Sequence, residues 1–280
     1  MEPSISTHLF VFDRLRREHL AHVAAAGFGT IELWAAGHHF PYEDDAAVAE
    51  LRGWLADLHL RVGSIHLPFY VDFGSPDFRF ISFAAPDQDV REVMTAKTKR
   101  LLEVATSLGC RFFVLHPTAT FKRDGSNRRR LHAALDWLVP ACEKRGQTIL
   151  LENIMMPESR TALLADTCRA YGEATGICLD TGHAHIDGGL LVELAAAAPH
   201  LRALHVHDNF GIDDDHLPPG EGNIDWPATL STLRMNAPHV NLFTFELSGP
   251  SGDTPDATAK RHARLESVKT FWQTHAEDLA

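Results

Sequence analysis

Nitrogen and oxygen donors are concentrated in residues 204–226, which read LHVHDNFGIDDDHLPPGEGNIDW. This stretch begins with a short apolar run that has the character of a buried strand. Five of its side chains can bind a divalent metal: His205, His207, Asp208, Asp214 and His216. Imidazoles and carboxylates gathered at a strand end are what such a site requires, because each supplies a lone pair in a fixed direction. A solvated polar loop is the alternative, and we favour the metal site because similar side chains recur along the chain.

The elements that position these donors alternate between strand and helix. Runs rich in apolar and β-branched residues predict strands at residues 4–10, 30–35, 61–68, 111–117, 148–154, 176–181, 201–207 and 240–247. Apolar residues at helical spacing follow them, and predict helices at residues 13–26, 43–59, 88–108, 160–170, 190–198, 226–235 and 255–275, with another that ends at residue 145.

Eight strand-then-helix units predict a parallel sheet, and their number and the length of the chain favour one closed α/β barrel, (β/α)₈. We expect a single domain over residues 1–280, because no linker rich in Pro, Gly or Ser separates the units. An open doubly wound sheet is less favoured, since no GxGxxG motif follows an early strand.

Barrel enzymes carry their chemistry at the C-terminal ends of the strands. From the second predicted strand onward, metal-competent side chains lie at or just after these ends: Glu32, His66, His116, Glu152, Asp180, His183, His205, His207 and Glu246. Residues two apart in a strand share a face, so Leu150 and Glu152 can both point inward. Buried together, Glu152, Asp180 and Glu246 would repel one another unless a cation lay between them.

The amino-acid composition indicates which kinds of molecule the protein can bind and where it is located. The chain has 26 basic and 37 acidic residues and a formal net charge of −11, which disfavours nucleic acid and favours a small-molecule substrate. No apolar run is long enough to span a membrane. The cysteines form no CxxC pair, which predicts free thiols in a reducing compartment, the cytoplasm: Cys110, Cys142, Cys168 and Cys178. The sequence leaves the oligomeric state open, and a homo-oligomer is possible.

Three motifs together carry a resemblance to a known family. They are DTGH at residues 180–183, HxHDN at residues 205–209, and DxHLPPGEGNIDW from Asp214. Over nearly its whole length the chain resembles the xylose isomerase-like TIM-barrel superfamily, which includes sugar isomerases and epimerases, inosose dehydratases and endonuclease IV. The resemblance implies a metal-dependent enzyme with a TIM-barrel fold.

The resemblance also implies two nested sets of metal ligands. The epimerase-like members hold one metal with residues that correspond to Glu152, Asp180, His205 and Glu246. Endonuclease IV holds further zinc ions with residues that correspond to His66, His116, His183, Asp214 and His216. The first set suits zinc, manganese or magnesium, whereas the histidine-rich full set favours zinc, so one to three divalent ions per chain are expected.

Two mechanisms compete. In an isomerase or epimerase acting on a sugar, polyol or related hydroxy-carbonyl compound, Glu152 or Glu246 removes the proton next to a metal-bound carbonyl. The other carboxylate or a histidine returns it through an enediolate that the metal stabilises, and we predict Glu152, Glu246 and His183 as the catalytic residues. In an endonuclease IV-like zinc phosphodiesterase, a metal-bridging hydroxide attacks phosphorus, with Glu152 bridging two ions.

We favour the isomerase or epimerase, because the net charge of −11 opposes a grip on phosphates. Five cations between residues 122 and 130 are more simply a solvated loop than a phosphate contact: Lys122, Arg123, Arg128, Arg129 and Arg130. An inosose dehydratase-like lyase ranks third, and a barrel that binds without turnover is disfavoured. The predicted substrate contacts are Glu32, Trp34, Phe69, His207 and Trp226.

Overall fold

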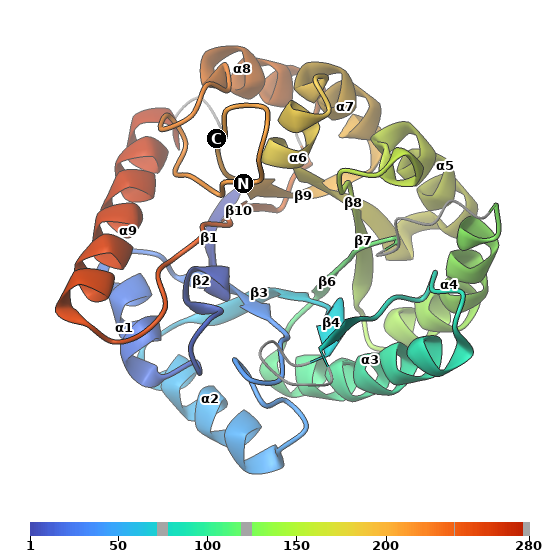
Figure 1. The fold of residues 1–280 in the computed structure, drawn as a ribbon, viewed down its shortest axis with the longest axis horizontal. Helices are drawn as coiled ribbons and strands as arrows, with labels where there is room; N and C mark the ends of the chain where they lie inside the picture. Colours follow the sequence, from blue (N-terminus) through green and yellow to red (C-terminus); the bar gives the residue numbers. More distant parts are fainter. Residues whose placement is uncertain (72–77, 119–124, 238, 277–280) are drawn as a thin grey trace.

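Eight parallel strands close into a ring, seen end-on at the centre of Figure 1. The computed structural model describes residues 1–71, 78–118, 125–237 and 239–276. The strands are β1 (Glu2–Ser6), β2 (Thr30–Trp34), β3 (Arg61–His66), β6 (Phe112–Leu115), β7 (Thr148–Glu152), β8 (Thr175–Asp180), β9 (Leu201–Val206) and β10 (Leu242–Phe245). Their order around the ring is β1-β10-β9-β8-β7-β6-β3-β2, so the predicted (β/α)₈ barrel is confirmed.

Helices surround the ring on its outer face (Figure 1). They are α1 (Arg17–Ala25), α2 (Asp45–Asp57), α3 (Gln88–Leu108), α4 (Asn127–Glu143), α5 (Thr161–Tyr171), α6 (Thr181–Ile186), α7 (Leu190–Ala197), α8 (Trp226–Asn236) and α9 (Pro255–His275). Local signals fix their ends. The Asp87 side chain accepts a hydrogen bond from Asp89 N at 2.9 Å before α3, and Gly109 ends this helix with φ 68°.

The interior of the ring is apolar below the level of the predicted site. One buried cluster fills it: Phe112, Val114, Leu150, Cys178, Ala203 and Leu242. Two residues further along their strands, the same inward face carries Glu152, Asp180 and His205. The alternation of the pleat therefore lifts the polar donors out of the apolar core to the C-terminal mouth of the barrel.

Three local predictions are corrected. The first strand ends at Ser6, not at residue 10, because the Ser6 side chain caps a short 3₁₀ helix (Thr7–Phe10) by accepting from His8 N at 3.3 Å. Helix α6 is not predicted; Asp180 caps it by accepting from His183 N at 2.7 Å. Helix α1 begins only at Arg17, because Asp13 instead accepts from Gly252 N at 2.9 Å.

Loops at the mouth add a small antiparallel pair, β4 (Tyr70–Val71) with β5 (Arg79–Phe80). Of the five predicted loop cations, Lys122 and Arg123 lie outside the described residues, and the other three lie in the first turn of α4. The four cysteines are free and buried. Within the described parts of the chain, every helix is too short or too polar to cross a bilayer.

Candidate metal centre

The floor of the site is a group of four buried donors, which we call group A: Glu152, Asp180, His205 and Glu246. They come from the ends of β7, β8, β9 and β10, and one ligand atom from each lies within 4.8 Å of the others. His205 Nδ1 is 2.8 Å from Glu152 Oε1 and 3.2 Å from Glu246 Oε2. The predicted four-residue ligand set is thus brought together at one place.

Glu32 fixes the orientation of His205. The other ring nitrogen, Nε2, is 3.1 Å from Glu32 Oε2, and Glu32 in turn accepts from Ser6 Oγ at 2.9 Å and from Ser64 Oγ at 2.8 Å. Such a carboxylate aims the histidine lone pair at a metal. The sequence predicts that Glu32 contacts substrate; the structure places its side chain fully buried against His205, and Glu32 is not among the residues that line the described cavity.

A second group, group B, consists of His66, His116 and Glu152. His66 Nε2 is 3.2 Å and His116 Nε2 is 3.1 Å from the same oxygen, Glu152 Oε2. His66 Nδ1 lies 2.9 Å from the carbonyl oxygen of Leu67, which can only accept, so Nδ1 donates and the Nε2 lone pair faces the carboxylate. Glu152 therefore presents one oxygen to group A and the other to group B.

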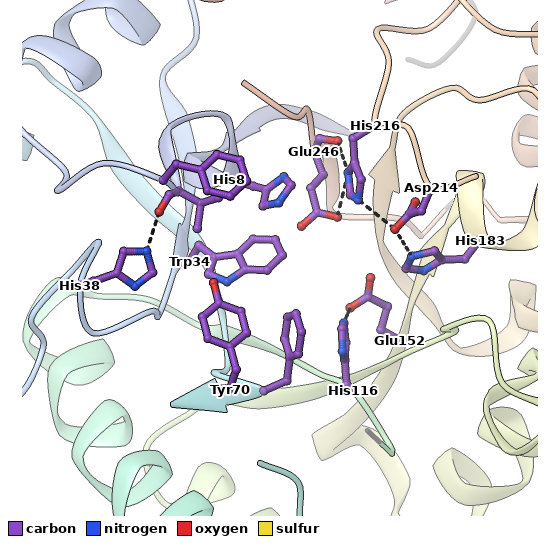
Figure 2. Close-up of a pocket in the computed structure, with 13 residues that line it drawn as sticks. His8, Trp34, His38, Tyr70, His116, Glu152, His183, Asp214, His216 and Glu246 are labelled. Carbon is purple, nitrogen blue, oxygen red and sulfur yellow. Dashed lines mark hydrogen bonds and ion pairs between the residues drawn. The ribbon is translucent and has the colours of Figure 1, made fainter. Parts of the chain in front are cut away.

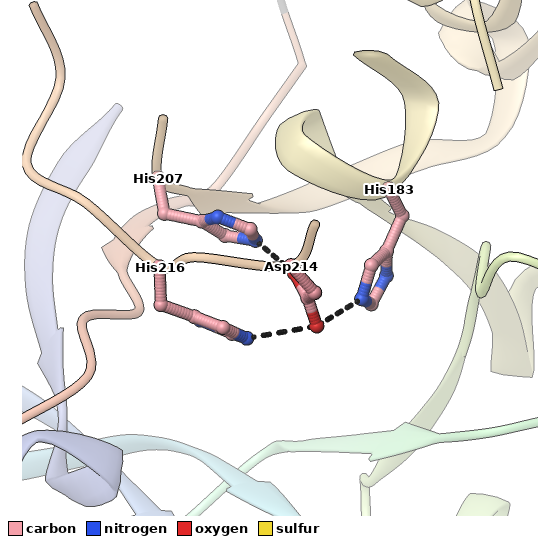
Figure 3. A group of neighbouring side chains, drawn as sticks. All are labelled: His183, His207, Asp214 and His216. Carbon is pink, nitrogen blue, oxygen red and sulfur yellow. Dashed lines mark hydrogen bonds and ion pairs between the residues drawn. The ribbon is translucent and has the colours of Figure 1, made fainter. Parts of the chain in front are cut away.

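A third group, group C, gathers His183, His207, Asp214 and His216 (Figure 3). The Nε2 atoms of His183 and His216 each lie 3.2 Å from Asp214 Oδ2. Their Nδ1 atoms donate to the carbonyl oxygens of Asn153 and Glu246, both at 2.9 Å, so each Nε2 can either present a lone pair to a cation or carry a second proton toward Asp214. A cation, or in its place protons on these two rings, can therefore balance the charge of Asp214.

His207 is the member of group C that contacts Asp180 of group A. Its Nε2 is 3.0 Å from both oxygens of Asp180, and its ring stacks on His216 with centroids 4.0 Å apart. A Cβ on Gly182 would lie 2.0 Å from His207 Cε1, which explains the glycine in the DTGH motif. His207, a predicted substrate contact, is fully buried and contacts Asp180, and it is not among the residues that line the described cavity.

A cavity of about 230 Å³ opens above groups A and C (Figure 2). Trp34 and Phe69, two of the predicted substrate contacts, line it. Trp34 is stacked between His8 and His66, with ring centroids 4.2 Å and 4.4 Å away. His8 and Tyr70 also line the cavity.

Trp226, the last of the predicted substrate contacts, is not among the residues that line this cavity. Its Nε1 donates to Asp208 Oδ2 at 2.8 Å, and its ring packs edge-on against Phe271. Asp208 also accepts from Gly220 N at 2.8 Å and from Ile224 N at 3.1 Å. The pair therefore organises the loop that carries Asp214 and His216.

We expect Trp226→Phe to destabilise the protein by about 1–3 kcal/mol without lowering its metal content, because Asp208 loses a buried donor. The free energy of unfolding in denaturant and the metal content by mass spectrometry test this. Trp54→Phe, on the half-buried face of α2, is the matched control. Loss of metal without loss of stability in Trp226→Phe would contradict this assignment.

The residues fit a bound cation in their electrostatics as well as their geometry. Burial raises the pKa of Glu152, but His205 and His116 outweigh it and leave this pKa well below its usual value. Burial lowers the pKa of His216, but its hydrogen bond to Asp214 raises it to about 9. Within the described residues, the buried Glu246 Oε1 has no hydrogen-bond partner. Carboxylates held ionised and an unused buried oxygen are what a divalent ion requires.

We expect the metal-free protein to lose stability as the pH rises from about 6.5 to 9. The pKa of His216 is raised from 6.5 to about 9 in the fold. Protonated His216 therefore stabilises the fold fully below pH 6.5, and this contribution disappears as the pH passes the folded pKa. Melting temperatures of chelator-treated protein across this range test it. His216→Gln should flatten the slope, the exposed His239→Gln should not, and a flat profile in the parent protein would contradict the assignment.

The sequence matches a known family and several curated relatives. The family described as "Xylose isomerase-like TIM barrel" matches residues 20–268. An uncharacterised protein of Sinorhizobium fredii is 34% identical over 145 residues, 48% of this chain and 47% of that protein. An uncharacterised protein of Methanocaldococcus jannaschii is 27% identical over 172 residues, 56% and 58% of the two chains. The chain spans about half the length of the curated relatives it matches.

Solved structures share the fold. A D-tagatose 3-epimerase-like protein superposes with a TM-score of 0.75 at 22% identity and 100% coverage of both chains. A D-psicose 3-epimerase studied in the presence of D-fructose gives 0.76 at 16% identity, over 100% of this chain and 99% of that one. The IolI protein with a bound zinc atom gives 0.76 at 18% identity, over 100% and 98%. With the match over residues 20–268, the chain belongs to the xylose isomerase-like TIM-barrel family.

Proposed function

We propose that the protein is a divalent-metal-dependent isomerase or epimerase of a sugar, polyol or related hydroxy-carbonyl compound. The observation that carries this proposal is group A, in which Glu152 and Glu246 flank His205 at the foot of a closed-in cavity. Structural neighbours that are sugar epimerases, and one that binds zinc, support it. Zinc or manganese fits these donors, and magnesium is less suited to the imidazole.

A divalent ion held by group A would polarise a substrate carbonyl and so acidify the neighbouring C–H bond. The chain's own residues then move the proton. Glu246 is the better base, because its Oε1 has no hydrogen-bond partner within the described residues and the side chain lines the cavity. Glu152 or His183, which line the same cavity, return the proton. Glu32 and His207 hold His205 and Asp180 in place during both transfers.

A phosphodiesterase is the second candidate, and groups B and C favour it. They supply two further sets of donors beside group A, and Glu152 belongs to both A and B, as a bridging ligand would. Against it, the chain has a net charge of −11, and the described lining of the cavity contains no Lys or Arg that could hold a phosphate. We also propose a cytoplasmic location, which the four free, buried cysteines support.

One experiment separates the two functions. Purified protein loaded with zinc or manganese is incubated with a panel of ketoses in D₂O, and deuterium uptake next to the carbonyl is followed by NMR. The same preparation is tested for hydrolysis of bis(p-nitrophenyl) phosphate and of DNA with an abasic site. Exchange that disappears in Glu246→Gln supports the isomerase or epimerase. Phosphodiester cleavage with no exchange in any ketose would replace it with the second candidate.

A further inference from the structure

His8 is a pocket residue that none of the three donor groups includes. It lies in the 3₁₀ helix directly after β1, and its backbone N–H donates to Ser6 Oγ at 3.3 Å. Figure 2 shows its ring among the side chains of the cavity, close to Glu246 and Trp34. The ring stacks on Trp34 and lies 4.7 Å from the ring of His216, so packing on two sides fixes its orientation.

The hydrogen bond of His8 determines which ring nitrogen carries the proton. Nδ1 lies 3.1 Å from the carbonyl oxygen of Leu247. A carbonyl oxygen only accepts, so Nδ1 must be the donor, and the neutral ring keeps its lone pair on Nε2. Within the described residues, no carboxylate is hydrogen-bonded to His8 that would favour a second proton. Nε2 therefore presents an acceptor to the cavity.

The lining of the cavity holds a second acceptor beside His8. Glu246 Oε1 is a second acceptor without a partner among the described residues. The residues described around the cavity include several aromatic rings and carboxylates but no Lys or Arg. A ligand that satisfies these two acceptors must bring hydrogen-bond donors of its own. Hydroxyl groups do so, whereas the oxygens of an ionised phosphate only accept.

We propose that His8 Nε2 accepts a hydrogen bond from a hydroxyl group of an unphosphorylated, polyhydroxylated substrate and so helps to determine specificity. This inference rests on the proposed function and narrows its substrate class. His8 recognises the substrate and leaves the ion to group A, so removing its acceptor should weaken substrate binding and leave metal content unchanged.

Two variants of His8 isolate the acceptor. His8→Asn can keep the donation to Leu247 but has no acceptor at the Nε2 position, whereas His8→Gln can place its amide oxygen there. Using D-fructose and its monodeoxy derivatives with metal-loaded protein, we expect about a tenfold higher KM or Kd for D-fructose in His8→Asn and partial recovery in His8→Gln. One monodeoxy derivative should be bound equally by the parent and His8→Asn, because the lost hydroxyl and the lost acceptor are partners. Equal weakening for every derivative would overturn the proposal.

The tautomer is tested without any substrate. Long-range ¹H–¹⁵N spectra of the labelled, metal-loaded protein should show His8 protonated on Nδ1, with His8→Asn identifying its signals. A proton on Nε2 would overturn the inference even if the protein is a sugar epimerase. Conversely, sugar binding with the expected deoxy pattern but no deuterium exchange would sustain the role of His8 and sink the proposed isomerase or epimerase reaction.

Discussion

Glu152→Gln is expected to lower turnover by about 1,000-fold or more and to strip metal from the protein. Glu152 Oε1 lies 2.8 Å from His205 Nδ1, and Oε2 lies 3.2 Å from His66 Nε2. The amide removes the charge that both donor groups share and places an N–H₂ where a lone pair is needed. The substitution therefore removes a predicted metal ligand and a predicted acid–base group at the same time.

The measurement pairs deuterium exchange in the ketose panel with metal content by mass spectrometry. Glu43→Gln is the matched control, since Glu43 is exposed and pairs with Lys97 at 3.1 Å on the outer surface. It should behave as the parent protein in both assays. A Glu152→Gln protein that keeps full metal content and normal turnover would remove Glu152 from the ligand set and from the mechanism together.

Removal of the metal is expected to lower the melting temperature by about 10 °C at neutral pH. A ligand present at about 1,000 times its Kd stabilises the fold by about 4 kcal/mol, and a chain of this size changes its Tm by about 2–4 °C per kcal/mol. In the metal-free protein, the carboxylates of group A are buried close together, and protons on neighbouring histidines such as His205 offset part of this repulsion.

Differential scanning calorimetry before and after treatment with a chelator measures the shift, and re-addition of zinc or manganese should restore it. Asp180→Asn provides a second comparison, because it weakens group A, and chelation should then change its Tm by much less. If verified metal-free protein melts at the same temperature as the metal-loaded form, the donor groups do not bind a structural or catalytic ion.

The ring and its donor-bearing strand ends could be predicted because both depend on short periodicities. Alternation of period two places Leu150 below Glu152 and Ala203 below His205, and the apolar residues of each pair mark the inward face. Parallel closure then brings Glu152 and Glu246 to one mouth although 94 residues separate them in sequence (246 − 152 = 94).

What could not be predicted depends on contacts between distant segments. Glu32 reads as one more donor at a strand end, but its serine partners and His205 bury it below the cavity. Trp226 follows the predicted metal-binding motif in sequence, yet its position in the N-terminal turn of α8 places its indole against Asp208. The periodicity of the sequence does not contain these contacts, because the position of each side chain depends on partners that are distant in sequence.

The end of β1 illustrates the same limit. A continuous strand to residue 10 fits the apolar pattern, whereas the Ser6 cap turns the chain after five strand residues. That turn places His8 against Leu247, which lies 239 residues further along the chain. A local pattern cannot report a hydrogen bond between the segments that follow the first and the last strand of a ring.

Closure of that ring has a consequence for assembly. β1 pairs with β10 from Glu2↔Leu242 to Ile5↔Phe245, so the first strand can complete its pairing only after the last strand has been formed. Pairings this far apart in sequence form slowly. Glu246 directly follows the last strand, so the four donors of group A come together only after this closure. An ion bound by group A would therefore be taken up at the end of folding.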